Sequence, residues 1–190
     1  NQTENSVVFV LESNSETLKN YPFEFQLQLE YELDGNELKM KYSVENKSNV
    51  TMPFSIGAHP AFTIEDSFSD YSLQFNEAEE FVSYELENEQ FNNSYRKIQS
   101  ENGQINLNYS HFEKDALVFK HLKSNNLTLL KKNQPFLSVN FKGFPYLGIW
   151  TKPNAPFLCI EPWCGLADNS NHNGNFMEKE GIQLLEKNGV

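Results

Sequence analysis

The chain has 190 residues, a formal net charge of −11 and an aromatic content of 14%, with 16 Phe and 8 Tyr. This length suits one domain, so we expect residues 1–190 to form a single domain with a substantial buried core, and so many broad rings favour a β-rich one. Nucleic acids and anionic membrane surfaces are excluded as partners, because both require clustered Lys or Arg and Arg96 is the only arginine.

The first expected strands lie in the first quarter of the chain. Residues 7–11 are an apolar run typical of a buried strand. Residues 23–33 alternate strictly between apolar and polar side chains, which is the pattern of a strand with one face in water. The return strand at residues 38–44 alternates as well, after the favoured turn pair Asp34-Gly35. Together these segments predict a β-hairpin.

The register of this hairpin follows from its turn. We expect Asp34-Gly35 to be the two-residue loop, so that Leu33 lies opposite Asn36 and Tyr31 opposite Leu38. In this register every apolar side chain of both strands lies on one face, and a slip by one residue would separate the two apolar faces.

The stretch Pro53–Phe62 reads PFSIGAHPAF, an apolar strand that breaks at Gly57 and places His59 in a bend. Pro60 fixes its own φ and keeps the residue before it out of the helical region, so we expect His59 to be extended and held in place. A histidine in this setting is either structural or an acid–base group, since its side chain titrates near neutral pH.

The rest of the chain predicts short strands separated by Asn, Gly, Pro and Asp. They span residues 71–75, 81–86, 104–109, 117–120, 127–131, 136–141, 146–151 and 157–161. Many short strands with little helix predict an all-β fold, an antiparallel β-sandwich.

Residues 157–165, FLCIEPWCG, predict a buried strand that ends in a carboxylate, because Pro162 cannot donate to a ladder. A carboxylate there is unfavourable unless it is paired or hydrogen-bonded, and Trp163 offers a flat apolar surface and one donor. Glu161 is therefore either a functional group or the point where the strand leaves the core. Asp115 is another candidate, with a turn that opens a strand as its alternative role.

The other histidines and both cysteines predict no chemistry. His111, His121 and His172 lie in polar surroundings without metal-ligand spacing, so we expect them on the surface. Cys159 and Cys164 are expected to be buried free thiols, because their spacing is not that of a redox or zinc pair. The sequence has no run of transmembrane length and no charged-then-apolar leader, so cytoplasm is the default compartment, and we expect neither a metal nor a cofactor.

Four co-linear motifs resemble those of the aldose 1-epimerases (galactose mutarotases), in particular their LacX-like branch. Residues 53–62 look like the GAHPAF signature of that branch, and residues 115–119 resemble its DALIF element. Residues 148–168 are similar to its GIW…CIEPW.G.AD segment, and residues 178–182 to its closing EKEGI. The order and spacing of the motifs agree across nearly the whole chain.

The resemblance implies a galactose mutarotase-like supersandwich that interconverts the α and β anomers of a free monosaccharide of the glucose or galactose class. It implies that Glu161 is the general base at the anomeric hydroxyl and His59 the general acid at the ring oxygen, facing each other across a sugar-sized gap. Asp115 would bind sugar hydroxyls, and Trp163 would contact the sugar. Acid–base assistance of this kind needs no metal or cofactor.

Members of the resembled family begin well before the first residue of this chain, and their opening part carries an arginine and a further histidine that reach the sugar. We therefore expect the chain to correspond to the later two-thirds of a family member, with a sandwich that is incomplete at its N-terminus. The alternatives are a sugar-binding module without turnover, a hexose-6-phosphate 1-epimerase and a purely structural β-domain. The scarcity of arginine disfavours a phosphorylated substrate.

Overall fold

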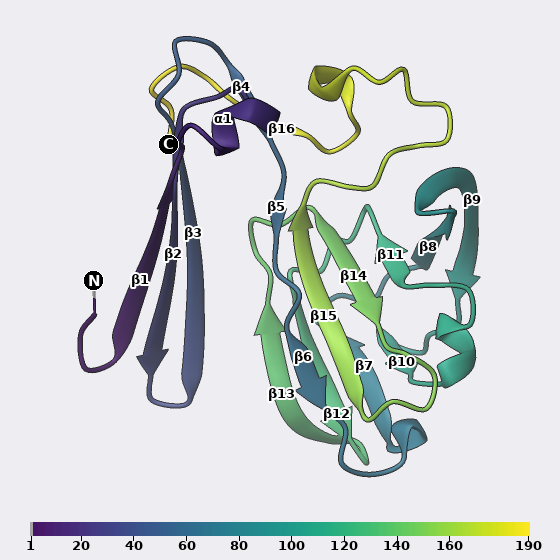
Figure 1. Ribbon diagram of the computed structural model, residues 1–190. Coiled ribbons are helices and arrows are strands. Elements are labelled where there is room, and N and C mark those ends of the chain that lie inside the picture. The colour runs from purple at the N-terminus through teal and green to yellow at the C-terminus, as the bar shows by residue number, and fades with distance from the viewer. Residues whose placement is uncertain (1) are drawn as a thin grey trace. The chain divides into compact units, whose positions relative to one another are not determined.

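The computed structural model describes residues 2–190, and contacts between residues group the chain into two compact units. Unit 1 comprises Asn1–Phe54 and Gln183–Val190, and unit 2 comprises Ser55–Ile182 (Figure 1). The strands of each sheet pair antiparallel, which confirms the predicted all-β antiparallel fold. The prediction that residues 1–190 form one domain stays a prediction. No helix in the described part of the chain is both long enough and apolar enough to cross a membrane.

Unit 1 is built on a three-stranded sheet. Its elements are β1 (Ser6–Glu12), α1 (Thr17–Asn20), β2 (Phe25–Asp34), β3 (Glu37–Asn46), β4 (Met52–Phe54) and β16 (Gln183–Leu185). The sheet order is β1-β2-β3, and β4 pairs with β16. The buried side-chain amide of Asn46 donates to the carbonyls of Val50 and Leu185, both at 2.8 Å. These bonds join the C-terminal segment to the end of β3.

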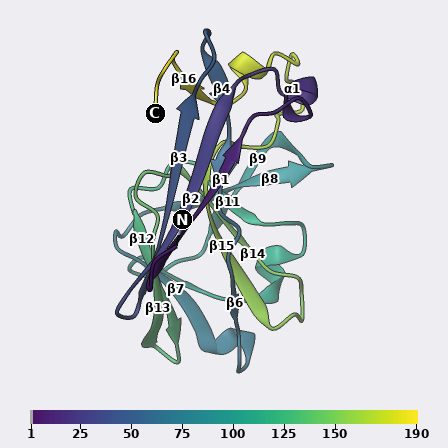
Figure 2. The same cartoon turned by 60° about the vertical axis from the view of Figure 1, so that its left-hand side comes forward.

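The hairpin of β2 and β3 is present (Figure 2). Its predicted register is wrong by two residues. Leu33 pairs with Leu38 instead of Asn36, and the loop consists of Gly35 and Asn36. Gly35 has a φ of 62°, a value that glycine adopts without strain and that the first loop position of a type II′ turn requires. The number of apolar cross-strand pairs stays the same, because Leu33–Leu38 replaces Phe25–Val44. Because a shift of two residues leaves each side chain on its face, the predicted apolar face is preserved.

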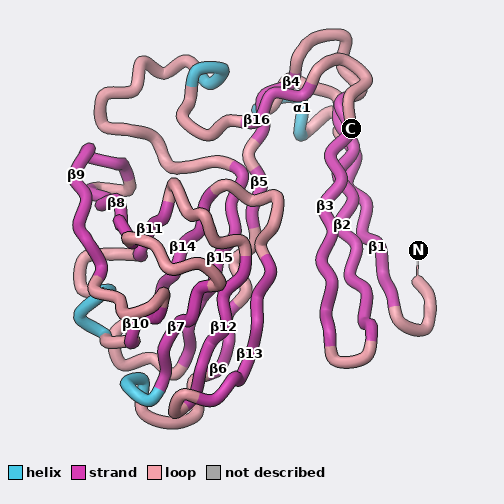
Figure 3. Tube along the Cα trace, turned by 180° about the vertical axis from the view of Figure 1, so that it is seen from behind, coloured by secondary structure: helices cyan, strands magenta, loops and turns pink. Residues whose placement is uncertain are grey.

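Unit 2 contains the remaining elements. Its strands are β5 (Ile56–Gly57), β6 (Ala61–Thr63), β7 (Tyr71–Phe75), β8 (Phe81–Glu87), β9 (Gln90–Ile98), β10 (Gln104–Asn106), β11 (Leu117–Phe119), β12 (Asn126–Lys131), β13 (Gln134–Asn140), β14 (Tyr146–Trp150) and β15 (Phe157–Cys164). Its short 3-10 helices are η1 (Phe68–Asp70), η2 (Tyr109–Phe112) and η3 (Phe176–Glu178). The smaller sheet has the order β10-β7-β12-β13 (Figure 3). The larger sheet has the order β5-β15-β14-β11-β8-β9, with β6 also paired to β15.

The core of unit 2 lies between these two sheets and takes alternate residues from each strand. In the larger sheet, β14 contributes Leu147 and Ile149, and β15 contributes Leu158 and Ile160, all of them fully buried. Successive side chains of a strand point to opposite faces. The odd-numbered residues 159–163 of β15 therefore lie on the face of the larger sheet opposite the core, which we call the site face.

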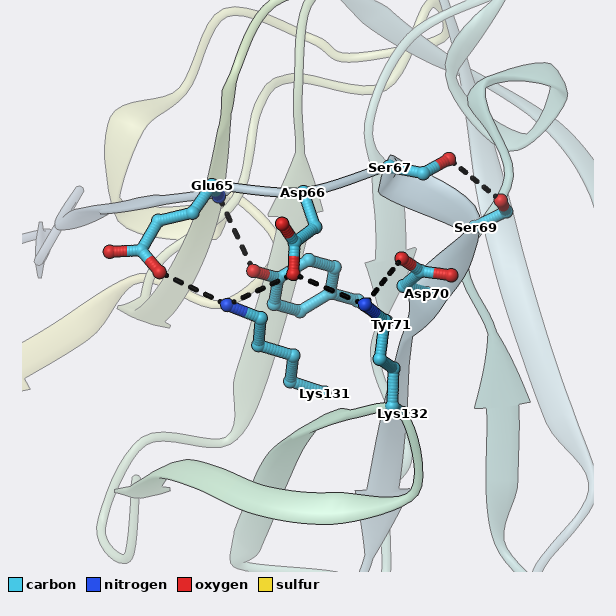
Figure 4. A network of polar contacts seen from close by, with 8 residues as sticks. All are labelled: Glu65, Asp66, Ser67, Ser69, Asp70, Tyr71, Lys131 and Lys132. Atoms are coloured by element: carbon cyan, nitrogen blue, oxygen red, sulfur yellow. Dashed lines mark hydrogen bonds and ion pairs between the residues drawn. The ribbon is translucent and has the colours of Figure 1, made fainter.

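A charge network fastens the segment between β6 and β7 to the end of β12 (Figure 4). Lys131 Nζ lies 3.0 Å from Glu65 Oε2 and 3.2 Å from Asp66 Oδ2. Lys132 Nζ lies 3.5 Å from Asp66 Oδ2 and 3.6 Å from Asp70 Oδ2. The hydrogen bond and charge of Lys131, with the charge of Lys132, hold the pKa of the Asp66 carboxyl below its ordinary value. The network thus fixes the segment that leaves β6, which is one of the strands that frame the candidate site.

Candidate active site

Glu161 lies in β15 on the site face, opposite Gly148 of β14. Its side chain is only 6% exposed. The expectation that β15 ends at Glu161 is wrong, since the strand continues through Pro162 to Cys164. Pro162 lies beside the interruption between β5 and β6, where its carbonyl accepts a hydrogen bond from the Ala58 amide at 3.0 Å. Because the neighbouring strand is interrupted there, no amide proton is needed from Pro162, and the proline is tolerated within β15.

His59 lies in the interruption between β5 and β6, and both of these strands pair with β15. Trp163 pairs with Gly57 in the antiparallel pair of β15 and β5. His59 follows Gly57 by two residues and Glu161 precedes Trp163 by two residues, so the same register places His59 opposite Glu161. The register is the same on the β6 side of the interruption. The Pro60 carbonyl accepts a β15 amide at 3.3 Å, which holds the bend against the strand. The backbone therefore brings these two side chains together.

The two side chains are in direct contact, with 3.4 Å between His59 Nε2 and Glu161 Oε1. Burial raises the pKa of the Glu161 carboxyl above its ordinary value. The charge of His59 and a hydrogen bond from the Trp163 side chain act in the opposite direction, and the charge of Asp115 adds to the rise. Glu161 is therefore a buried carboxylate whose proton affinity depends on three neighbouring groups.

The expected sugar-sized gap between these two side chains is absent, because they contact each other. The contact still suits chemistry at an anomeric carbon, since the hydroxyl and the ring oxygen are bonded to the same carbon. An acid and a base that act on those two oxygens must be close neighbours. The His59 side chain is 63% exposed, so it is the partner that can shift when a ligand enters.

The indole of Trp163 lies across the larger sheet, over a glycine on each side of β15. A Cβ atom at Gly148 would lie 2.4 Å from Trp163 Cζ2, and one at Gly57 would lie 2.7 Å from Trp163 Cδ1. Both distances are far below van der Waals contact, so only glycine permits this approach at either position. The half-buried indole is thus fixed on the sheet while it hydrogen-bonds Glu161.

Asp115 precedes β11 and is half-buried, and its Oδ1 accepts a hydrogen bond from the Ala116 amide at 2.7 Å. Its carboxylate also lies near enough to Glu161 to raise the pKa of that carboxyl. The structure therefore gathers all the predicted site residues around Glu161. His59 is linked to it by contact, Trp163 by a hydrogen bond and Asp115 by charge.

Trp150 and Cys159 also lie on the site face, although no pattern in the sequence predicts a role for either of them in the site. The Trp150 ring meets the His59 ring edge-on, with 6.3 Å between centroids, and Trp150 pairs with Cys159. Both cysteines are free thiols, as predicted, but Cys164 is only half-buried. Burial and the charge of Glu161 raise the pKa of the Cys159 thiol to about 11. One ligand atom each from His59, Cys159 and Glu161 lies within 4.8 Å of the other two, so these residues could hold a metal ion.

Lys120 is a buried cation beside a small apolar cluster of unit 2 that includes Phe91, Tyr84 and Trp163. Its side chain is 5% exposed, and its Nζ lies 2.8 Å from Glu180 Oε2. The Nζ also lies 4.0 Å from the ring centroid of Phe91 and 4.7 Å from that of Tyr84. This pair joins the closing EKEGI motif to the larger sheet.

The remaining histidines lie elsewhere. His121 and His172 are exposed, as predicted. The prediction of a surface position for His111 is wrong, because its side chain is half-buried beside Arg96, which donates to the His111 carbonyl. Burial, and then the charge of Arg96, lower the pKa of the His111 imidazole.

Comparison with known proteins finds relatives along nearly the whole chain. The family model of the aldose 1-epimerases matches residues 1–182. Two proteins of Lactococcus lactis subsp. lactis, "Protein LacX, plasmid" and "Protein LacX, chromosomal", are each 37% identical to the chain. The match covers 92% of this chain and 62% of each relative. The chain thus spans less than two thirds of the length of these relatives.

Solved structures with the same fold include two from lactobacilli. A galactose mutarotase related enzyme from Lactobacillus acidophilus has a TM-score of 0.90 and 31% identity, over 99% of this chain and 65% of that chain. A galactose mutarotase-like protein from Lactobacillus casei has a TM-score of 0.88 and 26% identity, over 100% of this chain and 67% of that chain. These matches confirm the predicted galactose mutarotase-like fold.

Proposed function

Because the chain belongs to the aldose 1-epimerase family, we propose that it interconverts the α and β anomers of a free hexose of the glucose or galactose class. One observation carries most of the proposal: an exposed imidazole, His59, lies 3.4 Å from a buried carboxylate, Glu161. An acid and a base so close together can act on the two oxygens of one anomeric carbon.

The proposed reaction needs one proton acceptor and one proton donor. The Glu161 carboxylate accepts the proton of the anomeric hydroxyl, and protonated His59 donates a proton to the ring oxygen. The bond between the anomeric carbon and the ring oxygen breaks, which leaves the open-chain aldehyde. After rotation about the bond between carbons 1 and 2, the ring closes on the other face of the aldehyde. Closure returns both protons, so each group recovers its starting state.

The surroundings of the pair support these roles. Burial raises the pKa of the Glu161 carboxyl, which makes its anion a stronger base. The charge of His59 and the hydrogen bond from Trp163 favour the ionised form that the reaction requires. Each positioned acid or base contributes about 10²–10⁴-fold to such a reaction. The Asp115 carboxylate would accept hydrogen bonds from sugar hydroxyls, and the Trp163 indole would contact an apolar face of the sugar ring.

The test follows the optical rotation of freshly dissolved α-glucose and α-galactose with the chain added. We expect the rate to exceed that of the buffer blank and to fall to the blank in Glu161→Gln. The matched control is Glu101→Gln, because Glu101 is exposed and does not belong to the site. A rate equal to the blank for the folded, unsubstituted chain overturns the proposal.

The same sugars, tested for binding as well as for anomer exchange, separate the alternatives. Saturable monosaccharide binding without anomer exchange would identify a sugar-binding module. Faster exchange on hexose 6-phosphates than on free hexoses would identify the phosphorylated substrate class. No binding of either sugar would leave a structural β-domain.

A further inference from the structure

We propose that His59, Cys159 and Glu161 form an inhibitory binding site for a borderline-soft divalent cation such as Zn²⁺ or Cd²⁺. The three residues offer an imidazole nitrogen, a thiol sulfur and a carboxylate oxygen, and each of these atoms lies within 4.8 Å of the other two. Nitrogen, sulfur and carboxylate oxygen are the protein ligands that Zn²⁺ takes.

The distances fit a tetrahedral site after a small adjustment. Two ligands that lie 2.0–2.1 Å from Zn²⁺ at the tetrahedral angle are about 3.3 Å apart. His59 Nε2 and Glu161 Oε1 are already 3.4 Å apart. A thiolate and an imidazole nitrogen on the same Zn²⁺ ion are roughly 3.6 Å apart, so the Cys159 sulfur has to approach by little more than about 1 Å. The exposed His59 side chain can supply most of this movement.

The backbone arranges these ligands independently of any sugar. Cys159 and Glu161 are two residues apart in β15, so both side chains point to the site face. His59 lies opposite Glu161 across the strand pairing. A cation would enter past His59, which is 63% exposed, and would reach the two buried ligands behind it. The fourth coordination position would remain open for water.

The charges favour a divalent cation at this place. The Glu161 side chain is 6% exposed, and a buried carboxylate is stabilised by a cation in direct contact. When the metal binds, the Cys159 thiol releases its proton to solvent and the neutral imidazole of His59 donates its Nε2 lone pair to the metal. No oxidation or reduction takes part.

Metal binding and sugar turnover would exclude each other, because both require the same atoms of His59 and Glu161. The inhibition rests on the proposed function, whereas the binding does not. A test of binding without sugar therefore distinguishes a failure of this proposal from a failure of the proposed activity.

The binding experiment titrates the chain with Cd²⁺ and records the ultraviolet charge-transfer band of a cadmium–thiolate bond. We expect one equivalent to bind. Cys164→Ser is the matched control, because the second cysteine lies in the same strand and is a free thiol too. The control should keep the band, and Cys159→Ser should lose it, with Kd at least about tenfold weaker, since even outer-shell changes weaken metal sites by 10–100-fold.

His59→Ala provides a second variant in case Cys159→Ser does not fold, because an exposed side chain can be removed without opening the core. We expect its Kd for Cd²⁺ to rise at least about tenfold. The proposed site is overturned if binding is not saturable, if the band survives Cys159→Ser, or if it disappears in Cys164→Ser. With an active chain, Zn²⁺ should abolish anomer exchange over the concentration range in which it binds. Exchange at an undiminished rate with Zn²⁺ bound overturns the inhibitory role.

Discussion

Gly148→Ala should disable the site without changing either of the proposed proton-transferring groups, His59 and Glu161. The new Cβ atom would lie 2.4 Å from Cζ2 and 2.5 Å from Cη2 of Trp163. Carbon atoms pack at about 3.5–4.0 Å, so the indole has to withdraw by roughly 1 Å or more. At the other end of the ring, Cδ1 lies over Gly57, 2.7 Å from where a Cβ would be at that glycine, so both ends of the indole lie close to the backbone of the sheet. The indole must tilt away from the sheet, and its hydrogen bond to Glu161 is lost.

The expected loss of activity follows from this displacement. A misplacement of 1 Å in an active site costs about 10²-fold in rate. At 1.36 kcal/mol for each factor of ten, this corresponds to about 2.7 kcal/mol of transition-state stabilisation. The folded state should lose about 1–3 kcal/mol as well, which is the usual cost of overpacking.

The assay compares kcat/KM from polarimetry and the free energy of unfolding from urea titration in a double-mutant cycle of Gly148→Ala and Trp163→Phe. A phenyl ring leaves room for the added methyl group, so the two losses should not add, and their interaction energy should be about 0.5–3 kcal/mol. If Gly148→Ala retains kcat/KM within about twofold, or if the losses are additive, the indole is not fixed by this glycine in the way described.

Three further predictions concern the charges around the site. Glu161→Gln should abolish turnover yet raise the free energy of unfolding at neutral pH by up to about 2 kcal/mol. The pKa of the Glu161 carboxyl is raised in the folded state, so the folded chain binds this proton more tightly than the unfolded chain does. The free energy of unfolding therefore falls as pH rises from the unfolded to the folded pKa, and Gln, which does not titrate, removes this loss. An unchanged urea midpoint would contradict this prediction. The acidic limb of the kcat/KM profile should move to higher pH in Trp163→Phe and to lower pH in Asp115→Asn, because these groups shift the pKa of Glu161 in opposite directions, and superimposable profiles would refute the assignment. Glu180→Gln should destabilise the fold by about 2 kcal/mol, because it leaves the buried ammonium of Lys120 without its ion-pair partner. Lys120→Met should destabilise it less, because the Glu180 carboxylate that it leaves is 44% exposed. The reverse order of the two variants in urea titrations would rule this out.

The hairpin of β2 and β3 illustrates what sequence patterns predict and what they omit. Alternation with a period of two assigns each side chain to a face, and those faces are correct in the structure. The register depends instead on which two residues form the loop, and the pairing of Asp34 with Glu37 makes the loop Gly35-Asn36 in place of Asp34-Gly35. β9 has no apolar alternation to predict it, because it is rich in polar residues, and one of these, Asn93, has a φ of 65°.

The sequence singles out four residues of the candidate site, His59, Asp115, Glu161 and Trp163, but it does not predict how they meet. The motifs around His59 and Glu161 single out both residues, but their contact depends on how β5 and β6 pair with β15. Those two strands are too short to produce a pattern in the sequence. Pro162 suggests a strand end because it lacks an amide donor, but the sequence does not show that the neighbouring strand is interrupted beside it, where no donor is needed. The spacing of Cys159 to the other cysteine predicts no chemistry, although its position two residues before Glu161 in a strand puts both side chains on one face.

The most direct test of the account is the rate of α-to-β exchange of a free hexose in a double-mutant cycle of His59→Asn and Glu161→Gln. If the two side chains act together as acid and base, the unsubstituted chain exceeds the buffer blank. Each single variant then loses nearly all of that excess, and the double variant is no slower than either single one, because residues that act as a unit are not additive. Full exchange in either single variant, or losses that multiply in the double variant, would contradict the claim that these two groups share one reaction.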